Sequence, residues 1–145
     1  MLEIVLTTLI GLLGGVSVGL QGPIAGAMSQ RVGSSASSFI VHVSGAILSG
    51  VLLFARGGEM MQNWRALPWY MLGSGAFGLV LYLTLNYTLP RLGATTAVTL
   101  IIVGQLVMGM LIDQFGWFGV ALRPIDGWRV VAAMLLLMGG YLMVR

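Results

Sequence analysis

The segment that decides the fold is residues 19–26, GLQGPIAG, in which an amide and a proline interrupt an apolar run. It is either an interfacial turn that ends a first helix or a break within a longer one. Apolar residues continue beyond it, and the next charged residue is Arg31. A helix over residues 2–29 would be about 42 Å long, against about 30 Å for the bilayer core. We favour a helix kinked near residues 19–23, which keeps Gln21 inside the membrane zone.

The composition around this segment is that of an integral membrane protein. Hydrophobic residues make up 58% of the 145 residues and charged residues only 8%, whereas soluble domains carry about 25% charged residues. Mean hydropathy is +0.99. The net charge of +3 comes from scattered arginines, so no nucleic-acid surface is expected. The absence of cysteine excludes disulfides and thiolate metal sites. Glu3 and the lack of a basic leader argue against a cleaved signal peptide.

Five apolar segments of near-membrane length predict an all-α membrane protein with a single domain over residues 1–145. The expected helices cover residues 2–29, 35–54, 67–88, 94–112 and 128–144. Ser34 and Ser35 are the expected caps of the second helix, and Asp126 is the expected cap of the fifth. Pro68 suits the first turn of the third helix, and Pro90 is expected to limit its far end. Residues 113–127 are apolar and are expected to lie along the membrane interface.

Glycines at helical spacing predict close helix packing. Small residues allow helix backbones to approach each other in lipid, where no hydrophobic force drives association. The clearest pattern is a row of glycines at four-residue spacing on the first helix, and later helices carry single glycines of this kind. The glycines assigned to packing are Gly11, Gly15, Gly19, Gly45 and Gly109.

Few polar side chains fall inside the membrane zone, and they are the candidate pathway residues: Gln21, His42, Tyr82, Asn86 and Gln105. Each could instead make an interhelical hydrogen bond worth about 0.6 kcal/mol. His42 is either a packed neutral ring or a proton carrier, since histidine changes charge near neutral pH. Asp113, which closes the fourth helix, is the other candidate for proton coupling.

No enzyme is predicted. One histidine and four carboxylates cannot easily form a metal site or a catalytic triad, and no phosphate-binding glycine motif follows a strand. We therefore expect no catalytic residues, no metal and no cofactor.

Short motifs along the chain point to one family. They are Gln21 in the broken first helix, Gly33-Ser34, Gly45, Pro68-Trp69, PRLGATTA (90–97), VGQLVMGMLIDQFG (103–116) and Gly139-Gly140. Through these motifs the whole chain resembles the YdcZ-like, single-repeat, five-helix family of inner-membrane transporters in the drug/metabolite transporter superfamily. The resemblance implies an exporter of a small metabolite or drug-like compound. Members often carry an asparagine shortly after the glutamine of helix one, and QGPIAGAM (21–28) has none. If that amide contacts substrate in relatives, specificity differs here.

Three functions remain open from the sequence. A broken helix that carries an amide favours a secondary transporter with alternating access. Packed glycines and polar residues could also form a small channel, and a non-transporting membrane subunit is the third alternative.

The arginines predict dual topology. Five crossings would place Arg56, Arg65, Arg123 and Arg129 on one side, and Arg31, Arg91 and Arg145 on the other. Four against three is almost no positive-inside bias. Five helices are also few for enclosing a path, and transporters of this superfamily resemble two inverted five-helix repeats. We therefore expect the chain to insert into the lipid bilayer both ways. It would then form an antiparallel homodimer of ten helices around a small-molecule substrate.

Overall fold

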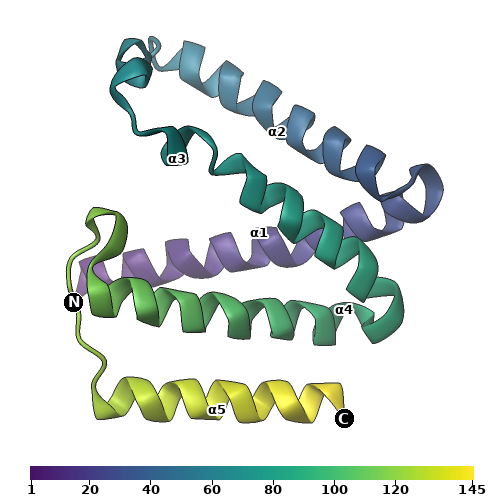
Figure 1. Cartoon of the computed structure of the whole chain (residues 1–145), viewed down its shortest axis with the longest axis vertical. Coiled ribbons are helices and arrows are strands. Elements are labelled where there is room, and N and C mark those ends of the chain that lie inside the picture. The colour runs from purple at the N-terminus through teal and green to yellow at the C-terminus, as the bar shows by residue number, and fades with distance from the viewer. The chain divides into compact units, whose positions relative to one another are not determined.

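The computed structural model describes all residues 1–145 and is helical, without a strand. Figure 1 shows its elements in chain order. They are α1 (Leu2–Val32), α2 (Ser34–Ala55), η1 (Met61–Ala66), α3 (Trp69–Leu72), α4 (Gly75–Phe115), η2 (Trp117–Gly119) and α5 (Gly127–Val144). The all-α class is confirmed. Contacts divide the chain into two compact units, residues 1–87 and 88–145, so the grouping of all helices into one domain stays a prediction.

Four helical stretches are long and apolar enough to cross a membrane: Leu2–Val32, Ser34–Ala55, Trp69–Phe115 and Gly127–Val144. The third has 47 residues, which at 1.5 Å per residue is about 70 Å, more than twice the bilayer core. Gly93 interrupts it with φ 76° and ψ 165°, a conformation that glycine adopts at little cost. The helix therefore passes through Pro90 and breaks at Gly93, with a span's length of helix on either side.

The GLQGPIAG segment is helical. α1 runs through Pro23 to Val32, so the segment does not form an interfacial turn. The chain reverses instead at Gly33, whose φ of 89° and ψ of 155° suit glycine alone. Gly33 takes the N-cap position of α2, and no side chain caps that helix. The expected caps at Ser34 and Ser35 are therefore wrong, because the reversal at Gly33 places both serines inside the helix.

In the unit of residues 1–87, α1, α2 and the first part of α4 pack through small and polar side chains. The Ser37 hydroxyl donates to the carbonyl of Ala25 at 2.8 Å and joins α2 to α1. A Cβ at Gly22 would lie 3.5 Å from Leu85 Cδ1, so α4 approaches α1 closely there. The Asn86 amide donates to the carbonyl of Ser34 at 3.2 Å. Such contacts are typical of helices in lipid, where close backbone packing replaces a hydrophobic core.

In the unit of residues 88–145, the second part of α4 packs against α5. The Thr96 hydroxyl donates to the carbonyl of Met143 at 2.9 Å. A Cβ at Gly140 would lie 3.2 Å from Val103 Cγ2. These partners run in opposite directions along the chain, so the two helices are antiparallel (Figure 1).

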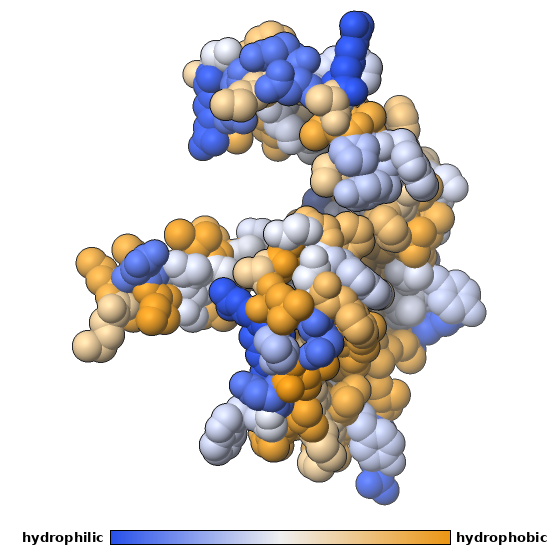
Figure 2. Space-filling view, turned by 60° about the vertical axis from the view of Figure 1, so that its left-hand side comes forward, coloured by the Kyte–Doolittle hydropathy of each residue, from blue (hydrophilic) through white to orange (hydrophobic).

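Apolar side chains cover the outside of the protein. The only buried hydrophobic residues are Ala25, Tyr82, Leu85 and Ala97, while large side chains such as Leu2 and Ile10 are 73% and 70% exposed. Figure 2 shows a surface dominated by hydrophobic side chains, with hydrophilic ones gathered in separate patches. In water such a surface would drive association, whereas in a bilayer lipid tails cover it.

Candidate functional site

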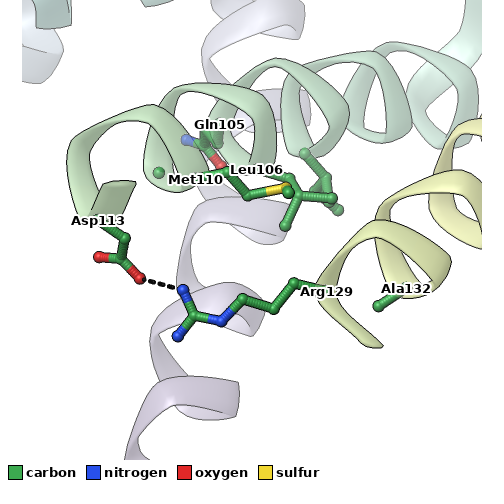
Figure 3. Close-up of a pocket in the computed structure, with 8 residues that line it drawn as sticks. Gln105, Leu106, Met110, Asp113, Arg129 and Ala132 are labelled. Carbon is green, nitrogen blue, oxygen red and sulfur yellow. Dashed lines mark hydrogen bonds and ion pairs between the residues drawn. The ribbon is translucent and has the colours of Figure 1, made fainter. Parts of the chain in front are cut away.

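A cavity of about 520 Å³ lies between α4 and α5 in the unit of residues 88–145. Gln105, Gly109 and Asp113 line it from α4, and their four-residue spacing places them on one broad helix face. Arg129 and Ala132 close it from α5 (Figure 3). The volume falls within the range of about 300–1,000 Å³ that is usual for small-ligand sites.

An ion pair forms one end of this cavity. Arg129 Nη1 lies 3.1 Å from Asp113 Oδ2, and both side chains are 32% exposed. The same nitrogen donates to the carbonyl of Arg123 at 3.2 Å. The Arg123 amide in turn donates to the carbonyl of Asp113 at 2.8 Å. Through these contacts, the segment that connects α4 to α5 is bonded to both residues of the ion pair.

The start of α5 positions Arg129. Asp126 is the N-cap, and its carboxylate accepts from the backbone amide of Arg129 at 2.8 Å, so the expected cap is confirmed. The side-chain carbonyl of Gln114 accepts from the amide of Ile125 at 2.7 Å and fixes the approach to the cap. The Arg129 side chain then reaches back from α5 to Asp113 (Figure 3).

A second polar cluster surrounds His42 between α2 and α4. His42 Nδ1 lies 2.7 Å from the carbonyl of Ser38, and since a carbonyl only accepts, Nδ1 carries the proton. The ring meets Tyr82 edge-on at 5.4 Å between centroids. A Cβ at Gly78 would lie 2.8 Å from His42 Nε2, so the ring lies directly over a glycine. A cavity of about 470 Å³ adjoins it.

Gln21 lines a groove of about 470 Å³ between α1 and α2, together with Ser17 and Ser44. The side chain is exposed on its helix, and none of the hydrogen bonds of the structure involves it. Gln105 is likewise exposed and without a partner in the chain. An amide left unpaired in an apolar medium costs roughly 2–7 kcal/mol, so direct contact of either glutamine with lipid tails would be unfavourable.

Tyr82 and Asn86 lie in the packed interior and line none of these three cavities. Asn86 is 4% exposed, and its Oδ1 has no hydrogen-bond partner. A buried acceptor of this kind costs about 1–3 kcal/mol.

The structure adds residues that the sequence did not single out. Arg129 was expected only as a flank of the fifth helix, and its position three residues after the cap Asp126 was the available signal. Ser38 lies four residues before His42, which is the spacing of a contact along one helix face. Gly78, which lies under the His42 ring, gave no signal of its own.

The five glycines expected to serve in packing have open space where a side chain would start. A Cβ at any of Gly11, Gly15, Gly19, Gly45 or Gly109 would meet nothing within 4 Å. Their role in helix packing stays a prediction. No three histidine, aspartate or glutamate side chains come together to form a metal site.

The fold and its cavities define a multi-pass helical membrane protein, and comparison with known proteins gives the family. The family described as "Putative inner membrane exporter, YdcZ" matches residues 6–142, and the chain belongs to it. A relative, the "Inner membrane protein YdcZ" of Escherichia coli (strain K12), is 24% identical over 140 residues, covering 90% of this chain and 91% of its own. No solved structure matches. The protein is therefore an inner-membrane protein of an exporter family.

Proposed function

We propose that the chain is one subunit of an exporter that carries a small molecule across the inner membrane by alternating access in an antiparallel homodimer. The observation that carries the proposal is the cavity of about 520 Å³ lined by Gln105, Asp113 and Arg129. A cavity that carries polar and charged side chains between spanning helices is what a transported solute requires. Export is supported by the family to which the chain belongs.

The two unpartnered glutamines support the dimer. Gln21 and Gln105 are exposed in spanning segments, where contact with lipid is unfavourable. A second chain in the opposite orientation would present its own polar residues across a two-fold axis in the membrane plane. It would also bring five further crossings, which supply the second half of an inverted repeat.

Flux in proteoliposomes tests the transport step. Gln21→Leu and Gln105→Leu should each abolish uptake while folded protein remains in the membrane. Gln62→Leu is the matched control, because Gln62 lies in η1 outside the spanning helices. Saturable exchange supports the carrier, whereas a passive ion current would indicate a channel. Wild-type flux in both leucine variants would contradict the proposed pathway. If the wild-type protein carries none of the tested solutes, the chain would be a non-transporting subunit.

Reporter fusions at Arg145 test the dimer. A dual-topology chain should show both locations of its C-terminus. Arginines added to the loops of one side should fix a single orientation and impair transport. Two variants fixed in opposite orientations should restore transport when they are expressed together. A single native orientation with full activity would contradict the antiparallel arrangement.

A further inference from the structure

The ion pair in the cavity leaves more hydrogen-bonding capacity unused than it employs. Arginine has five N–H donors. Both hydrogen bonds of the Arg129 side chain come from Nη1, to Asp113 and to the carbonyl of Arg123. The edge formed by Nε and Nη2 has no partner in the chain. That edge matches a carboxylate, which guanidinium groups bind through two parallel hydrogen bonds.

Asp113 has the complementary free group. Its Oδ2 meets Arg129, while Oδ1 has no partner in the chain. The side chain is about one third exposed, like that of Arg129, and both residues line the cavity. The remaining wall is apolar and includes Ile102, Leu106, Met110 and Ala132. The cavity thus combines one acidic group, one basic group and an apolar surface.

Helix stability does not account for these charges. Asp113 lies in the last turn of α4 and Arg129 in the first turn of α5. A helix dipole favours cations at its C-terminus and anions at its N-terminus, so each charge is at the less favourable end of its helix. The two charges compensate each other through their ion pair.

We infer that this cavity binds a small zwitterion with an apolar body, which names the substrate class of the proposed exporter and rests on that function. The ligand carboxylate takes the free edge of Arg129, and its ammonium takes Asp113 Oδ1. An anion alone would add a second negative charge beside Asp113, and a cation alone would add a positive charge beside Arg129. A zwitterion satisfies both groups without leaving a buried charge uncompensated.

Thermal stability of the full chain in detergent, titrated with four probes that share one apolar body, tests this inference. The probes are phenylalanine (zwitterion), its methyl ester (cation), N-acetylphenylalanine (anion) and the N-acetyl methyl ester (neutral). We expect phenylalanine to stabilise the protein at concentrations at least tenfold lower than the other three. Equal responses, or tighter binding of a singly charged or neutral probe, would overturn the inference.

Variants separate recognition from a structural ion pair. Arg129→Gln should shift the preference to the methyl ester, because Asp113 remains, and Asp113→Asn should shift it to N-acetylphenylalanine. If the glutamine variant does not fold, Arg129→Lys replaces it in the test. Lysine keeps the charge without the two-donor edge, so it should weaken the binding of phenylalanine about tenfold. Arg123→Gln is the control, since only the backbone of Arg123 contacts the pair. An unchanged order of preference in the folded variants would overturn the inference.

The outcome is separable from that of the transport proposal. Saturable flux of another solute, with no response to the four probes, would overturn the zwitterion inference and leave the exporter standing. Binding of phenylalanine at this cavity without flux in proteoliposomes would support the inference about the site and contradict the exporter.

Discussion

Replacement of Gly78 by alanine tests the position of the His42 ring, which lies between α2 and α4. The new Cβ would lie 2.8 Å from His42 Nε2, a distance that real Cβ contacts do not tolerate, so the ring must move. The ring is held by the bond from Nδ1 to the carbonyl of Ser38 at 2.7 Å and by the edge contact with Tyr82. Moving it therefore weakens both contacts.

The expected magnitude follows from two opposing effects. Alanine in place of glycine favours a helix by about 1 kcal/mol. Overpacking costs about 1–3 kcal/mol, and the hydrogen bond and aromatic contact at stake, each about 1 kcal/mol, agree with the middle of that range. We expect Gly78→Ala to lower the free energy of unfolding by about 1 kcal/mol, the difference between these effects.

The assay is reversible unfolding of the purified protein in mixed micelles. Gly104→Ala is the matched control, because Gly104 lies on the same helix and its Cβ would meet nothing within 4 Å. This control should be neutral or stabilising. Adding His42→Ala to Gly78→Ala removes the clash, so the double variant should be more stable than the sum of the two single effects predicts. Equal stability of Gly78→Ala and Gly104→Ala would refute the placement of the His42 ring over Gly78.

Three further predictions concern single side chains. Asn86→Leu removes a buried acceptor that has no partner together with the bond from Nδ2 to the Ser34 carbonyl; because these two effects on stability oppose each other, the free energy of unfolding should change by less than about 1 kcal/mol, and a larger loss would show that the bond to Ser34 outweighs the unpaired Oδ1. Asp126→Ala removes the cap of α5 and should destabilise the protein by about 1 kcal/mol, with Asp126→Asn near wild type; equal losses in both would argue against the cap. His42→Gln should abolish the pH dependence of transport if His42 carries protons, and an unchanged pH profile of flux would identify it as a packing residue.

Much of the fold followed from composition and local pattern. The low charge content and the apolar segments predicted a helical membrane protein, because a chain with so few charges cannot cover a soluble surface. The cap at Asp126 was predictable since it depends on residues that are neighbours in sequence. The break at Gly93 was not, because Pro90 is the stronger signal in the sequence, and only the backbone shows that the helix passes through it.

The candidate site was predicted only in part. Gln105, Gly109 and Asp113 shared a helix face by spacing alone, and they do line one cavity. Their partner Arg129 comes from another helix, 16 positions away from Asp113, and no local pattern relates the two. In the same way Asn86 meets Ser34 across 52 positions.

The glycines show most clearly which features depend on sequence and which depend on tertiary structure. The sequence displays a regular row at Gly11, Gly15 and Gly19, yet the close approaches between two long helices occur at Gly22, Gly78 and Gly140. A missing side chain allows two helices to approach but does not specify where they meet. The meeting points are determined by the reversal at Gly33 and by the partners on the facing helix, such as Leu85, His42 and Val103. Sequence therefore determined the class of protein and its helices, and only the tertiary structure decided which residues form its contacts and its cavity.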